Sequence, residues 1–202
     1  MIKVLELFSG TRSIGKCCDM LGWESVSVDM ILPATHKCDI MDFDYKQYPK
    51  DYFDIVWASP PCTQYSKAKS RGIRDIEGAN KIVLKTLEII NYFDCKYWFL
   101  ENPQTGKLKE QSFMKGLSFV DADYCMYGTP YRKRTRFWTN KKDINVLLCN
   151  KECGSFKEGR HIGSCGTGGK GQGHNKSYSD KTYSLLEKYA IPEDLIFSLF
   201  LD

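Results

Sequence analysis

The chain has 202 residues, which is enough for one sizeable hydrophobic core and short for two full domains. Apolar residues make up 42% of it and charged residues 27%, as is ordinary for a globular protein. No apolar run approaches the roughly 20 residues that cross a bilayer, which excludes a membrane-spanning protein. The net charge of +4 is compatible with a polyanionic partner.

The nine cysteines are scattered along the chain and form no tight framework. Residues 1–5 read as the start of a strand and leave no room for a signal peptide. We therefore expect a protein of a reducing, intracellular compartment. In such a compartment free thiols serve catalysis or a metal more often than disulfides.

Through the first hundred residues, short apolar runs alternate with segments of helical periodicity. Strands are predicted at 3–8, 24–29, 53–58 and 97–100, and helices at 12–21 and 76–93. This alternation predicts an α/β fold with a mostly parallel sheet and helices on both faces. Ligands of such sheets bind outside the carboxyl ends of the strands.

The pattern changes after residue 120. Residues 124–127 and 136–139 predict an antiparallel pair at one edge of the sheet. Residues 150–180 are rich in Gly, Lys, Ser and His, which indicates a mobile basic loop or a small irregular subdomain. Two short helices are expected at 180–190 and 193–201, separated by Pro192.

The first candidate site element is Glu6-Leu7-Phe8-Ser9-Gly10-Thr11-Arg12. A strand that leads through small residues into a helix presents backbone N–H groups, which suit a carboxylate or a phosphate. An ordinary strand-to-helix turn explains the same residues. Asp29 ends the next strand, where a carboxylate can bind a ribose diol or cap a helix, and Asp39 has the same two interpretations.

A second element is Ser59-Pro60-Pro61-Cys62. Two prolines fix the backbone just before the cysteine. A thiol at the end of a strand and ahead of a helix N-terminus has a lowered pKa, as a covalent nucleophile needs. The alternative is a buried, inert cysteine.

The third and fourth elements are Glu101 and a basic run at residues 131–138. Glu101 follows an apolar strand, where a carboxyl group can act as an acid; the alternative is a solvated loop residue. Arg132, Arg134 and Arg136 alternate, so on a strand they share one face and could bind phosphate or a base. A charged edge strand that prevents aggregation is the other interpretation.

In this order, the elements resemble the cytosine-C5 DNA methyltransferase family. Glu6-Leu7-Phe8-Ser9-Gly10 resembles its opening motif, Pro61-Cys62 its catalytic motif, and Glu101-Asn102-Pro103 its Glu-Asn-Val motif. Residues 132–136 are similar to its Gln-x-Arg-x-Arg motif. The resemblance covers residues 1–140 and looks most like the short phage and large-virus members, so the expected location is the cytoplasm or nucleus of a host cell.

The resemblance implies a Rossmann-like class I fold, S-adenosylmethionine as cofactor and double-stranded DNA as partner, with no membrane; it leaves the oligomeric state open. Cys62 is then the nucleophile that attacks carbon 6 of a flipped cytosine, Glu101 holds N3, and Arg134 and Arg136 contact the base oxygen or a phosphate. The implied cofactor-binding residues are Phe8, Ser9, Gly10, Thr11, Arg12, Ser13, Asp29, Met30, Asp39, Ile40 and Pro60. The implied nucleic-acid contacts are Ser66, Arg132, Lys133, Arg160 and Lys170.

Several positions depart from the family pattern. The usual Gly-Gly after the opening motif is Arg12-Ser13, the Val of Glu-Asn-Val is Pro103, and Thr63 replaces a Gln. The closing motif that completes the family's cofactor pocket is not recognisable. These departures keep two alternatives open, namely the same chemistry on RNA or a free cytosine nucleotide, and an inactive nucleic-acid-binding module.

We predict three parts: a catalytic, S-adenosylmethionine-binding core (1–140), a reduced target-recognition segment (141–180), and C-terminal helices that pack on the core (181–202). The middle segment carries basic residues suited to the DNA backbone: Lys141, Lys142, Lys151, Lys157, Arg160, Lys170 and Lys176, with His161 and His174. Cys149, Cys153, His161 and Cys165 also suggest zinc, but their spacing is looser than in the usual sites. We assign no metal from the sequence.

Overall fold

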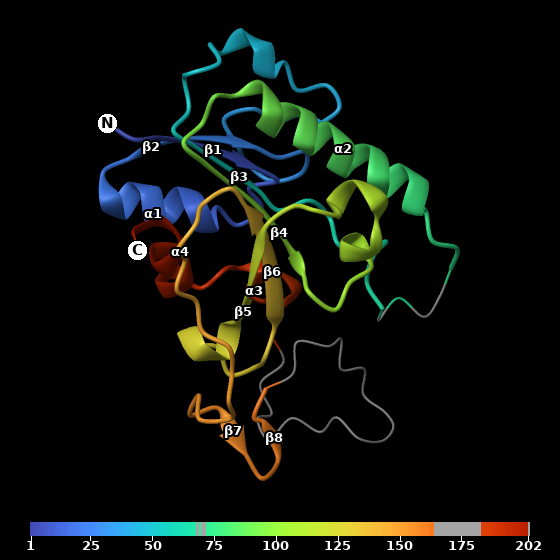
Figure 1. Cartoon of the computed structure of the whole chain (residues 1–202), viewed down its shortest axis with the longest axis vertical. Helices are drawn as coiled ribbons and strands as arrows, with labels where there is room; N and C mark the ends of the chain where they lie inside the picture. Colours follow the sequence, from blue (N-terminus) through green and yellow to red (C-terminus); the bar gives the residue numbers. More distant parts are fainter. Residues whose placement is uncertain (68, 70–71, 164–182, 202) are drawn as a thin grey trace.

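A six-stranded sheet forms the centre of the computed structural model, which describes residues 1–67, 69, 72–163 and 183–201. Its strand order is β2-β1-β3-β4-β6-β5 (Figure 1). The first four strands are parallel, and β6 runs antiparallel to both β4 and β5. The strands are β1 (Lys3–Leu7), β2 (Glu24–Val28), β3 (Ile55–Ala58), β4 (Tyr97–Pro103), β5 (Phe119–Asp123) and β6 (Arg134–Thr139).

Helices cover both faces of this sheet, as the sequence predicts. On one face, α2 (Ile76–Tyr92) buries Val83 and Ile89 in a cluster with Leu5 and Leu100. On the other face, α1 (Ser13–Leu21) and α4 (Glu193–Leu201) pack around the buried Trp57. The remaining helices are α3 (Leu185–Tyr189) and the 3₁₀ turns η1 (Tyr45–Gln47), η2 (Leu108–Glu110), η3 (Ser112–Met114) and η4 (Tyr124–Tyr127).

The ends of the two long helices follow from local chemistry. Gly22 ends α1 in the left-handed conformation at φ 68°, which a residue without a Cβ adopts at little cost. Asp75 caps α2 because its side chain accepts a hydrogen bond from the Gly78 N–H at 2.7 Å.

The antiparallel edge differs from the prediction. Residues 124–127 form the 3₁₀ turn η4, and the strand that pairs with β6 is the preceding β5. Two cross-strand ion pairs accompany this register, because Asp121 lies opposite Arg136 and Asp123 opposite Arg134. The apolar residues of 124–127 had suggested a strand, but they are buried in a turn.

After β6, the chain leaves the sheet and forms a small hairpin of β7 (Phe156–Lys157) and β8 (Arg160–His161), at the lower end of Figure 1. Residues 164–182 lie outside the described part, including Lys170, Cys165, His174 and Lys176 of the sequence predictions. Among described residues, no helix is both long and apolar enough to cross a membrane.

Lys141 begins the segment expected to grip DNA, yet it is buried. Its Nζ donates hydrogen bonds to the carbonyl oxygens of Leu199 (2.9 Å) and Phe200 (3.2 Å) at the end of α4. A cation there complements the negative end of the helix. The prediction that Lys141 binds DNA is therefore wrong, because its ammonium group is buried and hydrogen-bonded to carbonyl oxygens of α4.

Candidate active site

The turn after β1 is held by the protein's own carboxylates. Glu6 is buried and accepts hydrogen bonds from the backbone N–H groups of Ile14 and Gly15, both at 3.1 Å. Burial raises the pKa of Glu6 to about 7, although these two bonds lower it. The N–H groups of Ile14 and Gly15, at the start of α1, are thus taken by Glu6 and are not free for a cofactor carboxylate.

Asp29 closes the same turn from the end of β2. Its Oδ2 accepts from the Gly10 N–H at 2.9 Å, and its Oδ1 accepts from the N–H groups of Ile31 and Leu32, each at 2.8 Å. Gly10 has φ +49°. A carboxylate has about four lone-pair positions, so Asp29 can still accept from a ligand.

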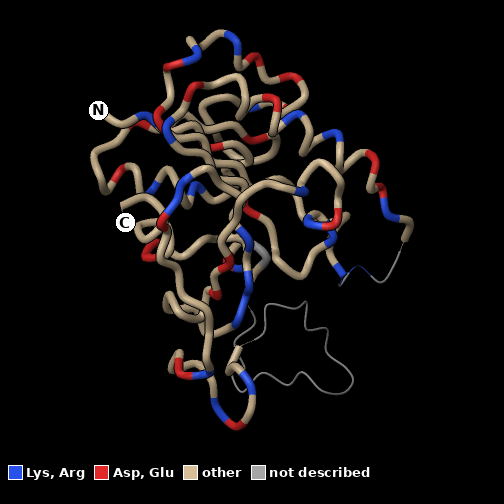
Figure 2. Tube along the Cα trace, in the orientation of Figure 1, with Lys and Arg blue, Asp and Glu red and all other residues tan. Residues whose placement is uncertain are grey.

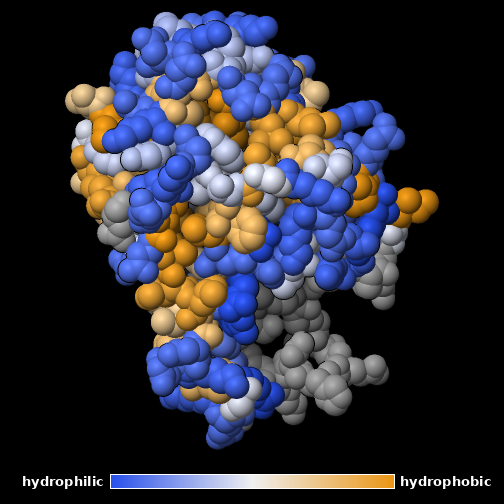
Figure 3. All heavy atoms as spheres, viewed as in Figure 1, coloured by the Kyte–Doolittle hydropathy of each residue, from blue (hydrophilic) through white to orange (hydrophobic). Residues whose placement is uncertain are grey.

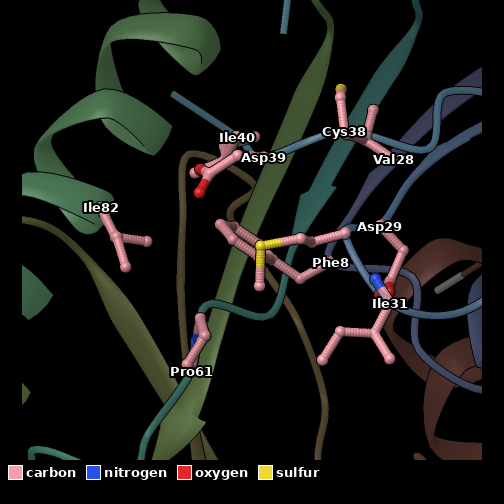
Figure 4. Close-up of a pocket in the computed structure, with 10 residues that line it drawn as sticks. Phe8, Val28, Asp29, Ile31, Cys38, Asp39, Ile40, Pro61 and Ile82 are labelled. Carbon is pink, nitrogen blue, oxygen red and sulfur yellow. The ribbon is translucent and has the colours of Figure 1, made fainter. Parts of the chain in front are cut away.

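A pocket opens beside this turn, and Figure 4 shows Phe8, Asp39, Pro61 and Ile82 around it. Its walls are mostly apolar and it also presents two carboxyl groups, as a nucleoside with a ribose diol requires. The lining residues are Phe8, Val28, Asp29, Met30, Ile31, Cys38, Asp39, Ile40, Pro61 and Ile82.

Five of the predicted cofactor residues line this pocket: Phe8, Asp29, Met30, Asp39 and Ile40. Pro61 takes the place expected for Pro60. Sequence reasoning also missed Val28, Ile31 and Cys38, which are neighbours of predicted residues. It missed Ile82 because nothing local in α2 indicates that this side chain faces a ligand.

The remaining predicted cofactor residues have varied surroundings. The Ser9 hydroxyl is buried and has no hydrogen-bond partner in the structure, so a bound cofactor could supply one. Ser13 Oγ instead accepts from the Ile191 N–H at 3.1 Å and lies 3.3 Å from Thr11 Oγ1. The Arg12 guanidinium lies 3.6 Å from Asp19.

Arg12, just before α1, adopts the left-handed conformation at φ 58°. A residue with a Cβ costs roughly 1 kcal/mol in this conformation.

The turn that carries Cys62 is tied to β4. The Asn102 side chain donates a buried hydrogen bond of 2.9 Å to the carbonyl oxygen of Pro60. After Cys62 the chain makes a single turn, in which the Tyr65 N–H donates to the Cys62 carbonyl at 3.0 Å. Tyr65 is fully buried, and its hydroxyl donates to Asn80 at 2.8 Å. The thiol therefore sits on a rigid turn.

The expected lowering of the Cys62 pKa is wrong for this structure. No helix follows directly, because α2 begins only at Ile76, so no helix N-terminus stabilises a thiolate. Burial raises the pKa of the thiol, the Glu101 charge raises it further, and the Lys133 charge lowers it. These influences place Glu101 and Lys133 within electrostatic range of the sulfur.

Glu101 lies on β4 and is 7% exposed. Its Oε1 is 3.9 Å from the Lys133 Nζ. Lys133 also donates to the carbonyl oxygen of Lys188 at 3.2 Å and stacks over the Tyr124 ring, with its Nζ 4.6 Å from the centroid. The Lys133 side chain, expected to contact DNA, is 14% exposed and is directed towards the carboxyl group.

Arg134 and Arg136 share one face of β6, as predicted, but that face is not the face of Glu101. Glu101 is paired with Phe137, and neighbouring residues of a strand point to opposite faces. Both arginines make two-pronged ion pairs on β5, Arg134 with Asp123 and Arg136 with Asp121, at 2.6–3.0 Å. Their contact with a base stays a prediction.

The other predicted nucleic-acid contacts come from three different segments. Arg132 Nε donates to Asp123 at 3.1 Å. Ser66 follows the Cys62 turn, and its carbonyl oxygen accepts from Arg74 at 2.6 Å. Arg160 is exposed on β8. The structure brings Cys62, Glu101 and Lys133 together, and Ser66, Arg132 and Arg160 are not part of this group.

Comparison with known proteins gives a consistent result. The family described as "C-5 cytosine-specific DNA methylase" matches residues 29–113. A protein of Frog virus 3 (isolate Goorha), named "Probable DNA (cytosine-5)-methyltransferase", is 33% identical over 194 residues, which cover 85% of this chain and 89% of the relative. The chain belongs to the C-5 cytosine-specific DNA methylase family.

The expected enzyme class, a cytosine-C5 methyltransferase, is thereby confirmed. Among solved structures, the DNMT2 E260A/E261A/K263A mutant of Spodoptera frugiperda matches with a TM-score of 0.51 and 16% identity over 76% of this chain. This likeness supports the Rossmann-like methyltransferase fold. The chain spans about half of the length of such structures, 56% in this case.

Proposed function

We propose that this chain methylates carbon 5 of cytosine in double-stranded DNA, with S-adenosylmethionine as donor and Cys62 as covalent nucleophile. The proposal rests on the hydrogen bond that the Asn102 side chain donates to the carbonyl oxygen of Pro60. It joins the Cys62 turn to the strand of Glu101. A single pyrimidine could then contact the thiol and the carboxyl group together.

The pocket beside Phe8 fits the nucleoside part of the cofactor. Phe8, Ile40 and Ile82 offer apolar contact to an adenine ring, and Asp29 and Asp39 can accept from a ribose diol or an amino group. Pro61 contributes to the pocket wall one residue before Cys62, so the cofactor side and the thiol are adjacent. When bound, S-adenosylmethionine supplies an electrophilic methyl group.

The residues of the chain supply the remaining chemistry. The Cys62 thiolate forms a bond to carbon 6 of cytosine, the 5,6 double bond breaks, and its electron pair makes carbon 5 nucleophilic. Glu101 holds a proton at N3, which stabilises the charge that develops there. After methylation, a water molecule takes the carbon 5 proton, and the electron pair of that C–H bond re-forms the 5,6 double bond as the Cys62 thiolate leaves.

Lys133 is proposed here as a positioning residue, in addition to the family pattern. Its ammonium group lies close to Glu101 and lowers the pKa of Cys62. A cation that acts on both groups favours the thiolate and limits the repulsion between two negative charges. The sequence offered no sign of this role, because Lys133 belongs to a basic run that suggests phosphate binding.

The proposed DNA surface lies around this centre. Figure 2 shows a run of basic residues at the start of β6 and further ones on the β7–β8 hairpin. Ser66, Arg132 and Arg160 would contact the backbone there, and a target base in a duplex must be flipped out at a cost of a few kcal/mol. The substrate would be DNA within a host cell.

A covalent trap tests the proposal. A DNA duplex that contains 5-fluorocytosine carries fluorine where a proton must leave, so the Cys62 adduct should persist in the presence of the cofactor and survive denaturing electrophoresis. Cys62→Ser should form no adduct, whereas Cys95→Ser, which lies outside the cofactor pocket, should still form one. An adduct that forms equally in Cys62→Ser would refute Cys62 as nucleophile.

The substrate is tested in parallel. Labelled methyl groups from the cofactor should enter duplex DNA, whereas structured RNA and free dCMP should remain unlabelled. Label in RNA or dCMP alone would retain the chemistry and overturn the DNA substrate. No label in any of the three would favour the inactive binding module.

A further inference from the structure

Three cysteines and one histidine from separate parts of the chain meet at one point outside the active site. Cys125 lies in η4, Cys149 and Cys153 lie in the loop after β6, and His161 lies on β8. Their ligand atoms are all within 4.8 Å of one another. His161 Nε2 is 3.4 Å from both Cys149 Sγ and Cys153 Sγ.

These distances suit a tetrahedral metal centre. Zinc binds sulfur at about 2.3 Å and imidazole nitrogen at about 2.0–2.1 Å, so neighbouring ligand atoms of a tetrahedron lie roughly 3.5–3.8 Å apart. The sulfur–nitrogen distances of 3.4 Å are close to this range. Three soft thiolates with one imidazole favour zinc and disfavour hard cations such as Mg²⁺ and Ca²⁺.

We propose that Cys125, Cys149, Cys153 and His161 bind one structural zinc ion. Four protein ligands leave no open position, so the site would stabilise structure and would not activate water. The site is separate from the proposed methyl transfer, because none of the four residues is among those that line the cofactor pocket. It also differs from the set suggested by the sequence, because Cys125 takes the place of Cys165.

The surroundings of the sulfurs support a metal-bound thiolate. The Lys151 N–H donates to Cys149 Sγ at 3.3 Å, and such bonds stabilise the negative charge on a ligand sulfur. Lys151 adopts the left-handed conformation at φ 80°. Three thiolates, one neutral imidazole and Zn²⁺ would carry a net charge of −1.

The hairpin also needs a cross-link. Its strands have two residues each, and an isolated hairpin of this length is not stable in water. Figure 3 shows that the surface at this end of the molecule is mainly hydrophilic, so little apolar burial is available. A metal that joins Cys125 of the core to His161 of the hairpin would replace the missing core.

A hydrogen bond also connects the four proposed ligands to the ion pairs of Asp123 at the edge of the sheet. The Cys149 N–H donates to Asp123 Oδ2 at 2.9 Å, and the same carboxylate pairs with Arg134. The zinc site would therefore anchor residues 149–161 against the end of β5. It would place the hairpin beside the basic start of β6.

Elemental analysis of the full chain, purified without a polyhistidine tag, tests the proposal. The wild-type protein should contain one zinc ion per chain. Cys153→Ser and His161→Ala should each lower the content at least tenfold after dialysis against a weak chelator. Cys95→Ser, a half-buried cysteine outside the cluster, should keep a full equivalent.

Substitution with Co²⁺ gives a second readout that does not depend on activity. The cobalt protein should show thiolate charge-transfer absorption and the strong d–d bands of tetrahedral geometry. At saturating Co²⁺, Cys153→Ser should show about one third less charge-transfer absorption per bound ion, because one of three thiolates is lost. Wild-type protein that holds no zinc and gives no tetrahedral bands would overturn the proposal. A disulfide among the three cysteines after reducing purification would overturn it as well.

Discussion

The parallel half of the sheet and its antiparallel edge use buried charge in opposite ways. In the parallel half, Glu6 accepts from two backbone N–H groups at the start of α1, and burial raises its pKa although these bonds and the Arg12 charge lower it. At the edge, Asp123 is fully buried but accepts from Arg132, Arg134 and the Cys149 N–H. Burial alone would raise the Asp123 pKa, yet these bonds lower it. The difference shows that the surroundings of a buried carboxyl group, more than its depth, decide its charge.

Removal of the edge carboxylate should have the largest effect. Asp123→Ala removes the buried carboxylate that accepts from Arg132, Arg134 and the Cys149 N–H, so we expect a loss of about 4 kcal/mol in the free energy of unfolding. Chemical denaturation at pH 7 measures it. Glu77→Ala is the control, because the exposed pair of Glu77 with Lys81 should contribute nothing measurable. Equal stability of the two variants would contradict the network.

Glu6, the buried carboxyl group at the start of α1, should make the free energy of unfolding fall as the pH rises. A folded-state pKa of about 7 against 4.5 in the unfolded chain means that the stability from protonated Glu6 is complete below pH 4.5 and is lost as the pH rises through 7. The loss is on the order of 3 kcal/mol. Glu6→Gln should abolish this slope in denaturation curves taken across pH 4.5–8, and an unchanged slope would assign it to other groups.

The stability from Asp123 has the reverse dependence. Its folded-state pKa is lowered, so its contribution is present above the ordinary Asp pKa and is lost as the pH falls through the lowered value. In a plot of the free energy of unfolding against pH, Asp123→Ala should therefore reduce the slope on the acid side. Glu6→Gln should reduce the slope near neutral pH.

Substitution of Lys133 should show whether this residue positions the reacting groups or binds DNA. Lys133→Met should lower kcat about 100-fold, equivalent to about 2.7 kcal/mol, because the thiolate and the Glu101 carboxyl lose their shared cation. It should leave the Kd for DNA and its salt dependence unchanged, and Lys133→Arg should restore part of the rate. Alkylation of Cys62 by iodoacetamide should rise with pH in the wild type and require a higher pH in Lys133→Met. Weaker DNA binding with normal kcat would support the phosphate contact instead.

The cofactor pocket should give the smallest change. Ile82→Ala removes part of the apolar wall and should raise the Kd for S-adenosylmethionine about fivefold, or about 1 kcal/mol. Leu84→Ala is the control on the same helix, because Leu84 is 47% exposed and is not among the pocket residues. Calorimetric titration compares the two, and equal affinities would exclude Ile82 from the binding surface.

Sequence reasoning succeeded where a feature is local. The parallel strands are nearly continuous apolar runs that end in small or acidic residues, so β1 to β4 and both acids of the pocket could be predicted. Gly22 and Asp75 likewise mark helix ends by chemistry that is visible in the sequence. These features depend on neighbours within a few residues.

Features that depend on distant contacts were missed or assigned wrongly. Lys133 comes just before β6 and is directed towards Glu101 because β6 pairs with β4, which carries Glu101. Ile82 lines the pocket only because α2 packs across the sheet. Cys125 and His161 lie 36 positions apart in the sequence, and no local spacing reveals that their ligand atoms come together. The expected lowering of the Cys62 pKa failed because it assumed a helix that begins 14 residues later.

The hydrogen bonds from Lys141 to the carbonyl oxygens of Leu199 and Phe200 have a consequence for gene variants. A premature stop before codon 199 would remove these acceptors and take two hydrogen bonds from an ammonium group in the interior, 5.3 Å from the centroid of the Tyr97 ring. Missense changes at codons 199 and 200 keep the backbone carbonyl oxygens, so they should leave these two hydrogen bonds in place.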